Sequence, residues 1–446
     1  MPYAIDLFCG AGGMSEGIIQ AGFHILFSSD INEDVQKTYM NRHEQLGFIQ
    51  NYNTYFHRGD IRELNGEFIW NVIRHLRIFT DGEQQEPQEI DAVFGGPPCQ
   101  GFSRAGRRDP NDPRNLLFKE YLRVVREINP RYVVMENVEG FNDTKFYGFE
   151  GVTGQVYENG SLAPEILRNE FHLIGYNTLE PRVLDASDYG VPQRRRRVIF
   201  IAYRNGEIEP RYPEPIYNDY NRLTVLDAIG DLIRDENLRE VINPQLTDYQ
   251  IASRRGRTPT INGNTINSNG NIYNNDISNH LPLIVERFSL FREGEDGTLV
   301  RRRILSEGID ISEKSHLLNE CCNKLGISRE ELIQRFRTGE VNEEMLDVIL
   351  TRKSIRTRLN RNRPALTVVT LPDDYISPFE NRVFSVREMA RLQSFDDSFI
   401  FLGKRTTGGD RRRVEVPQYT QVGNAVPPLL AKAIASEIMK AITRGL

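Results

Sequence analysis

A cysteine stands at the centre of the most distinctive stretch of this 446-residue chain. The stretch at residues 91–103 reads DAVFGGPPCQGFS, in which two glycines and two prolines stop an apolar run at once. The pattern predicts a buried strand that ends in a tight loop, and open α/β sheets bind ligands beside such strand ends. Cys99 follows the prolines, and the polar Gln100 and Ser103 follow Cys99. We expect Cys99 to act as a nucleophile; the alternative is a buried structural cysteine, the usual role of a free thiol.

An acid at the end of a second apolar run is the next candidate for chemistry. Residues 132–135 read YVVM, and Glu136 and Asn137 follow directly. The run predicts a buried strand, where packing at a surface explains an acid poorly. Glu136 is therefore expected to face a substrate, with a structural ion pair as the alternative.

Four consecutive arginines at residues 194–197 form the third candidate. They precede an apolar run at residues 198–202 that predicts a strand. Alternate side chains of a strand share a face, so Gln193, Arg195 and Arg197 are expected to point together. An apolar strand that begins with arginines indicates contact with phosphates or with a polarised substrate atom.

These groups need a fold to position them, and the N-terminus predicts its first unit. Residues 4–8 form a short apolar run, residues 9–13 a glycine-rich turn, and a helical pattern starts near Ser15. Strand, glycine-rich turn and helix are typical of a nucleotide-binding βα unit, because the glycines let a ligand approach the backbone and the helix start offers free N–H groups. By itself such a turn fits several classes of enzyme.

Two acids follow predicted strands where they suit a nucleoside. Asp30 ends an apolar run at residues 25–29, 24 residues after Asp6, a spacing suited to accept hydrogen bonds from ribose hydroxyls. The alternative for Asp30 is a helix N-cap. Ile31 is placed to lie against an adenine ring, and Asp60 to receive an adenine amino group.

The composition describes an ordinary globular protein, with 39% hydrophobic and 26% charged residues. No apolar run approaches the ~20 residues that span a bilayer, and no basic region precedes an apolar one at the N-terminus. We therefore expect a cytoplasmic protein without membrane contact. Four cysteines are too few for a disulfide framework, and the adjacent Cys321 and Cys322 lack the spacing of zinc ligands, so no metal is expected.

The net charge of −6 argues at first against a nucleic-acid partner. Binding depends on where charge lies, however, and basic side chains gather at residues 194–197, 301–303 and 352–363. These runs suit a DNA backbone. A solvated face explains any single run equally well.

Three motifs together resemble those of the DNA (cytosine-5) methyltransferases. They are GGPPCQGFS at residues 95–103, ENV at residues 136–138 and QVGNAVPP at residues 421–428. The resemblance implies an α/β, Rossmann-like AdoMet-dependent methyltransferase fold, with helices on both faces of a mixed, mostly parallel sheet, plus a smaller variable target-recognition domain. It implies a catalytic AdoMet-binding domain at residues 1–205, a target-recognition domain at 206–375 and a return to the catalytic domain at 376–446.

The same resemblance implies a role for each matching residue. Cys99 is expected to be the nucleophile, Glu136 and Arg197 to hold the target cytosine, and Arg195 to support the closed site. One departure is Asp396, which stands where the family usually has a proline and puts the geometry of a turn in doubt. Further substrate-side positions are Gln100, Ser103, Asn137 and Gln193. The positions that match the family's cofactor contacts are Asp6, Leu7, Phe8, Gly10, Ala11, Gly12, Gly13, Asp30, Ile31, Asp60, Ile61, Pro97, Leu117 and Asn424.

The activity implied is transfer of a methyl group from S-adenosyl-L-methionine (AdoMet) to C5 of a cytosine flipped out of a specific duplex DNA sequence, through a covalent bond between Cys99 and C6. A monomer of the bacterial restriction-modification type is expected, which protects host DNA from a restriction endonuclease without needing to touch it. Three alternatives stay open: a tRNA cytosine-5 methyltransferase of the same fold, a silent DNA-binding relative and an NAD-dependent dehydrogenase. The long variable window weighs against the first, the retained cysteine and acid against the second. Against the third stands the absence of the GxGxxG fingerprint and of a hydride-relay site.

Overall fold

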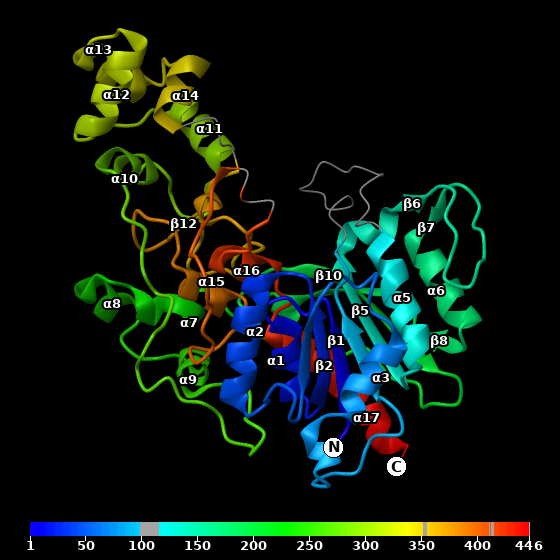
Figure 1. The fold of residues 1–446 in the computed structure, drawn as a ribbon. Coiled ribbons are helices and arrows are strands. Elements are labelled where there is room, and N and C mark those ends of the chain that lie inside the picture. Colours follow the sequence, from blue (N-terminus) through cyan, green and yellow to red (C-terminus); the bar gives the residue numbers. More distant parts are fainter. Residues whose placement is uncertain (99–115, 351–354, 410, 412–413, 446) are drawn as a thin grey trace.

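A mixed β-sheet forms the centre of the molecule (Figure 1). The computed structural model describes residues 1–98, 116–350, 355–409, 411 and 414–445. In this part of the chain the sheet has eight strands in the order β3-β2-β1-β4-β5-β10-β8, with β9 paired to β10. The strands β3, β2, β1, β4 and β5 are parallel, and β10 is antiparallel to β5, β8 and β9. The strands are β1 (Tyr3–Leu7), β2 (His24–Asp30), β3 (Tyr55–Arg58), β4 (Ala92–Gly95), β5 (Tyr132–Val138), β8 (Tyr176–Thr178), β9 (Arg182–Asp185) and β10 (Arg196–Arg204).

Helices cover both faces of this sheet, as the sequence predicted. The alternation of β1 explains why both faces are apolar: Ile5 and Leu7 lie in the hydrophobic cluster of one face and Ala4 in that of the other. On the face of Ile5 pack α3 (Gly66–Arg74), α5 (Leu117–Ile128) and α6 (Ala163–Leu173). On the face of Ala4 pack α1 (Gly13–Gln20), α2 (Glu33–Leu46) and α17 (Pro428–Arg444). The short α4 (Arg77–Thr80) follows α3.

The order of the strands places a binding site at one edge of the sheet. β1 lies between β2 and β4. The chain first adds β2 and β3 on one side of β1 and then adds β4 and β5 on the other side. In open α/β sheets the crevice outside the carboxyl ends of the strands at such a switch point is where ligands bind. The carboxyl ends of β1, β2, β4 and β5 all meet there.

The C-terminal helix returns to the N-terminal unit. α17 packs along α1, so the two ends of the chain lie together (Figure 1). Gly17 permits this contact. A Cβ atom at Gly17 would lie 2.5 Å from Cβ of Ala431 and 2.6 Å from the carbonyl oxygen of Pro428, and would also meet the backbone nitrogen of Lys432.

We therefore expect Gly17→Ala to destabilise the protein by about 3 kcal/mol, because the added methyl group would push backbone against backbone. Alanine ordinarily stabilises a helix relative to glycine by about 0.5–1 kcal/mol, so the sign of the effect identifies the packing. Thermal unfolding followed by circular dichroism measures it. Gly408→Ala is the matched control, since a Cβ atom there meets nothing within 4 Å. Equal unfolding midpoints for both variants would contradict the proposed close approach.

A second region extends away from the sheet and is largely helical (Figure 1). One of its hydrophobic clusters contains residues of α7, α9, α15 and α16. Another contains residues of the consecutive helices α10, α11, α12, α13 and α14. A small sheet in this region pairs β11 (Thr357–Arg358) with β12 (Tyr375–Ile376), whereas the pair of β6 (Lys145–Phe146) and β7 (Ser161–Leu162) lies beside α5 and α6 (Figure 1). The helices are α7 (Val225–Ile229), α8 (Glu236–Ile242), α9 (Asp248–Arg255), α10 (Pro282–Phe288), α11 (Gly297–Glu307), α12 (Ser315–Leu325), α13 (Arg329–Thr338), α14 (Glu343–Leu350), α15 (Val386–Leu392) and α16 (Gln418–Asn424).

The strands β8 and β9 are separated by a break at residues 179–181 and pair with opposite ends of β10.

At the turn that lacks the family's proline, Ser394 adopts a left-handed backbone with φ 69°. The buried Asp396 carboxylate holds the following turn by accepting hydrogen bonds from the backbone N–H groups of Ser398 (3.1 Å) and Arg257 (2.7 Å). The helix that precedes the turn begins with a capping box of Ser385 and Glu388.

None of the helices in the described part of the chain combines the length and the apolar character that a membrane span requires.

Candidate active site

A cavity of ≈ 650 Å³ opens at the switch point of the sheet. Its walls come from the ends of β1, β2 and β5, the turns after β3 and β4, and residues 414–426 near the C-terminus. Fifteen of the residues predicted as site residues line it, and they come from the expected cofactor, catalytic and substrate-side sets. They are Asp6, Phe8, Gly10, Ala11, Asp30, Ile31, Asp60, Ile61, Pro97, Leu117, Glu136, Asn137, Arg195, Arg197 and Asn424.

The turn after β1 carries local strain at this cavity. Phe8 has φ 57°, a left-handed conformation that costs a non-glycine residue of the order of 1 kcal/mol. The N–H of Gly10 donates a hydrogen bond to Asp30 Oδ2 at 3.1 Å, and the N–H of Asn32 donates to Asp30 Oδ1 at 2.9 Å. Each oxygen of Asp30 therefore keeps a lone pair for a ligand. Burial raises the pKa of Asp30, and these backbone N–H groups oppose the rise.

The turn after β3 adds to the cavity an arginine that the sequence did not single out. Arg62 donates from Nε to both carboxylate oxygens of Asp60, at 3.0 Å each. This hydrogen bond lowers the pKa of Asp60. Ile31 is mostly exposed at the rim of the same cavity, so an apolar side chain is free to cover a ring.

Glu136 and Arg197 form an ion pair on neighbouring antiparallel strands. Nε of Arg197 lies 2.8 Å from Oε1 of Glu136, and the two side chains are 14% and 11% exposed. Asn137 Nδ2 donates to the carbonyl oxygen of Pro97 at 3.2 Å, which ties the end of β5 to the loop after β4. A base in this part of the cavity would therefore meet a carboxylate and a guanidinium already oriented against each other.

Arg195 and Gln193 reach toward the C-terminal segments instead. The Arg195 guanidinium donates to the carbonyl oxygens of Val368 (3.2 Å) and Gly423 (3.0 Å), and its buried Nε has no partner among the described residues. Burial, with repulsion from Arg197, lowers the pKa of Arg195. Gln193 is fully buried, lies outside the cavity lining, and donates to the carbonyl oxygen of Leu392 at 3.1 Å.

Besides the buried Gln193, six predicted positions are not placed on the cavity wall. Leu7, Gly12 and Gly13 support the turn from behind: Leu7 packs in the core and Gly12 caps α1 with φ 99°. Cys99, Gln100 and Ser103 lie outside the described residues, although Pro98 lines the cavity. The sequence reasoning missed Cys9, Arg62, Gln421, Ala425 and Val426, which the cavity includes. Their position within or beside the recognised motifs was the available signal.

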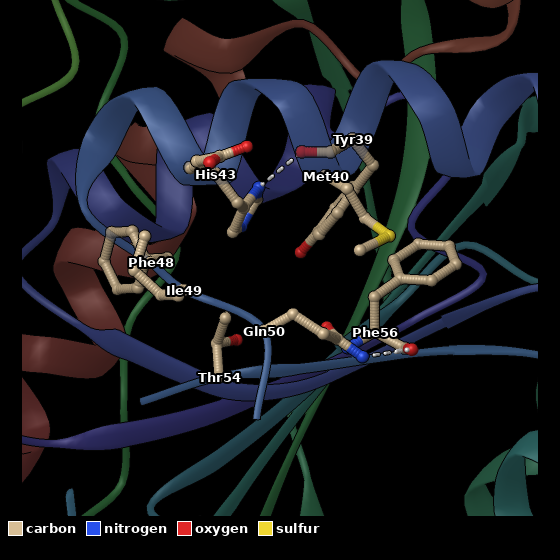
Figure 2. A pocket seen from close by; sticks show the side chains of 9 residues that line it. Tyr39, Met40, His43, Phe48, Ile49, Gln50, Thr54 and Phe56 are labelled. Carbon is tan, nitrogen blue, oxygen red and sulfur yellow. Dashed lines mark hydrogen bonds between the residues drawn. The ribbon is translucent and has the colours of Figure 1, made fainter. Parts of the chain in front are cut away.

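A second, smaller cavity of ≈ 150 Å³ lies behind the turn, between α2 and the segment that leads into β3 (Figure 2). Tyr39 stacks on His43 there, with ring centroids 3.9 Å apart. Cys9, Tyr39 and Phe56 form one buried cluster, and Cys9 lines the large cavity while the two rings line the small one. This cluster is therefore a wall between the two cavities.

Several arginines of the predicted basic runs are ion-paired or buried within the protein. Arg303 pairs with Glu295 at 2.7 Å, and Arg361 pairs with Glu293. Arg358 is buried and donates to the carbonyl oxygen of Ser377 at 2.8 Å. Arg194 and Arg196 are exposed at the start of β10, where they pair with Asp219 (3.7 Å) and Glu139 (3.0 Å) on the surface. Arg302 and Arg363 are exposed as well, so each of the three runs keeps a cation at the surface.

The chain matches a family model over nearly its whole length. The model describes the C-5 cytosine-specific DNA methylases and matches residues 3–440. The type II methyltransferase M1.HphI of Haemophilus parahaemolyticus is 32% identical over 439 residues, which cover 98% of this chain and 86% of that protein. The type II methyltransferase M.DdeI of Desulfomicrobium norvegicum is 30% identical over 440 residues, covering 97% of this chain and 88% of that protein.

A solved structure supports the fold independently. The crystal structure of a putative DNA modification methyltransferase encoded within an E. coli prophage superposes with a TM-score of 0.62 at 22% identity, covering 99% of this chain and all of that one. The mixed sheet, its helices and the cavity at the switch point thus define a Rossmann-like fold of the AdoMet-dependent methyltransferase class. Within that class the chain belongs to the C-5 cytosine-specific DNA methylase family, and it is a DNA (cytosine-5-)-methyltransferase.

Proposed function

We propose that this enzyme transfers the methyl group of AdoMet to C5 of a cytosine flipped out of a specific duplex DNA sequence, through a covalent bond to Cys99. The observation that carries the proposal is the shared cavity: the acids expected to hold a nucleoside and the Glu136–Arg197 pair line one continuous space. The methyl donor and the target base would therefore lie in the same cavity during the transfer.

The residues of the cavity fit AdoMet. Asp30 offers lone pairs to ribose hydroxyls, Asp60 offers an acceptor to an amino group, and Ile31 an apolar surface to a ring. Asp6 adds a buried carboxylate oxygen that has no partner among the described residues. When bound, AdoMet supplies an electrophilic methyl group beside a sulfonium charge.

The protein's own groups would make C5 reactive. The Cys99 thiolate adds to C6 of cytosine, the S–C6 bond forms, and the C5–C6 electron pair becomes available at C5. The exocyclic amine donates a hydrogen bond to Glu136, which also holds the proton at N3, while Arg197 balances charge at O2. After C5 has accepted the methyl group, a water molecule takes the proton from C5, the C–H electron pair re-forms the C5–C6 double bond, and the S–C6 pair leaves with sulfur, which restores the aromatic ring and the thiolate.

A stacked base cannot reach this cavity, so the target must leave the duplex. Flipping costs about a few kcal/mol, which phosphate contacts must offset. The exposed Arg194 and Arg196 at the cavity's side suit such contacts.

The remaining assignments rest on the family resemblance and on the names of the relatives. Residues 206–375 would read the target sequence, and residues 1–205 and 376–446 would form the catalytic domain. Because the similar proteins named above are type II methyltransferases, this monomer would protect host DNA in the cytoplasm from a restriction endonuclease that it need not contact.

The test is methyl incorporation from labelled AdoMet into duplex DNA and into tRNA, followed by sequencing of methylated cytosines. We expect incorporation into duplex DNA at one short sequence. Incorporation confined to tRNA would replace DNA by RNA as the substrate, and binding of AdoMet without transfer to either would refute the catalytic proposal.

Asp30→Ala should raise the dissociation constant of AdoMet by about tenfold to a hundredfold, since hydrogen bonds to a charged group contribute about 1.5–3 kcal/mol. Isothermal titration calorimetry without DNA measures this. Glu33→Ala is the matched control, because Glu33 lies on the same turn but pairs with Lys37 on the surface. An unchanged constant in Asp30→Ala would show that this carboxylate does not hold the ribose.

A further inference from the structure

Asp6 is a buried carboxylate with an incomplete set of partners. It lies at the end of β1, is 0% exposed and lines the large cavity. The Ser15 hydroxyl donates to Oδ2 at 2.5 Å. The other oxygen, Oδ1, has no hydrogen-bond partner among the described residues. An ionised carboxylate in this position is costly unless a positive charge comes near it.

The protein itself supplies no such charge within the described residues. Two of the cavity's arginines are paired elsewhere, Arg62 with Asp60 and Arg197 with Glu136, and Arg195 binds backbone carbonyl groups. The titratable groups that face Asp6 are acids or weak acids: Asp30 on β2, Cys9 in the turn, Tyr39 on α2 and Tyr121 on α5.

A short chain of hydroxyl groups fixes the one donor that Asp6 has. Ser28 Oγ lies 2.5 Å from the Tyr39 hydroxyl, which lies 3.1 Å from Ser15 Oγ. Tyr39 is held by its stacking on His43 in the wall of the small cavity (Figure 2). When these hydroxyl protons all point the same way, the chain ends in the donor to Asp6 Oδ2. These hydrogen bonds hold the Asp6 carboxylate in position, but none of them brings a positive charge that would neutralise it.

We propose that Asp6 faces the sulfonium of AdoMet and so favours the cofactor relative to its product: the unpartnered carboxylate is stabilised by the charge at sulfur, which S-adenosylhomocysteine lacks, while the ammonium group that both molecules carry adds nothing to the difference. The two molecules share adenosine and the amino-acid end, and AdoMet carries one more positive charge at sulfur. Asp6 thereby favours binding of the donor and release of the product. The inference rests on the proposed use of AdoMet.

The proposal has a consequence for pH dependence. Burial raises the pKa of Asp6 to about 7; the Ser15 hydrogen bond opposes this rise, and Asp30 adds to it. Above that pH the carboxylate is ionised before binding, so AdoMet affinity is constant. Below it, a proton must leave Asp6 when AdoMet binds, so affinity falls as pH falls, by up to about tenfold per pH unit. Affinity for S-adenosylhomocysteine should change little over the same range.

The experiment measures dissociation constants of AdoMet and S-adenosylhomocysteine by calorimetry, on the full chain without DNA, at about pH 6 and about pH 8. In Asp6→Asn, AdoMet should bind about tenfold more weakly at the higher pH while S-adenosylhomocysteine binds as before, since an opposite charge nearby is worth about one pKa unit or more. Asp60→Asn is the matched control: it removes a carboxylate that faces the part common to both ligands, so both constants should rise equally.

Each outcome decides the proposal. An unchanged ratio of the two constants in Asp6→Asn overturns it, even if both ligands bind. If Asp6→Asn does not fold, Ser15→Ala replaces it: loss of the Ser15 donor should shift the pH at which AdoMet affinity begins to fall upward, and no shift overturns the proposal. Failure of the unmodified protein to bind either ligand would instead refute the proposed function itself.

Discussion

Cys99→Ser should abolish methyl transfer, lowering turnover by at least about a thousandfold, because a serine hydroxyl is a far weaker nucleophile than a thiolate at neutral pH. Cofactor affinity should survive, since the cavity walls expected to hold AdoMet come from β1, β2 and β3. Turnover with duplex DNA and calorimetry with AdoMet measure the two effects separately.

Cys322→Ser provides the matched control for this substitution. Cys322 lies on α12 in the helical region, does not line the large cavity, and should tolerate serine with less than about a twofold change in turnover. Trapping with a 5-fluorocytosine oligonucleotide, in which the C5 substituent cannot leave, should yield a DNA adduct whose crosslinked peptide contains Cys99. A crosslink to another peptide, or a Cys99→Ser enzyme that keeps most of its turnover, would show that the nucleophile is a different residue.

Glu136→Gln should lower turnover by about 10²–10³-fold, because the variant keeps the shape of the side chain but loses the charge that pairs with Arg197 and the site that holds a proton at N3. The effect should fall on turnover more than on AdoMet affinity. Single-turnover methyl transfer at saturating AdoMet measures the chemical step.

Glu139→Gln is a close control for Glu136→Gln, since it breaks a neighbouring pair between the same chain segments. Glu139 pairs with Arg196 at 3.0 Å on the surface, where an ion pair contributes little. Its turnover should stay within about twofold of the unmodified enzyme. Equal losses in both variants would mean that Glu136 acts through local structure and not on the base.

The local sequence was sufficient to predict the strands and turns that hold the expected chemistry. β4 and β5 lie at the apolar runs that lead to glycine and proline or to an acid, and a capping box of Ser385 and Glu388 starts α15. Such signals are local, because strand alternation, turn residues and helix caps depend on neighbours within a few positions. The break between β8 and β9 escaped prediction because only their pairing with β10 reveals it.

The residue types at the site could also be predicted from the sequence, but their hydrogen-bond and ion-pair partners could not. Asp60 was identified as a nucleoside contact, but its partner Arg62 was not, and neither was the placing of Ser15 and Tyr39 around Asp6. The Glu136–Arg197 pair exists because β10 runs antiparallel to β5, a register that no single segment encodes.

The basic runs show most clearly what the sequence determined and what the tertiary structure decided. The sequence by itself determined the family motifs, the α/β class and the chemical groups available for catalysis. Only the tertiary structure decided how each arginine is placed: Glu293 and Glu295 fold back onto Arg361 and Arg303, while Arg194 and Arg196 stay exposed with partners on the surface. The physical reason is that an ion pair, a buried charge or a cavity wall depends on distances between remote segments, and those distances are set by packing.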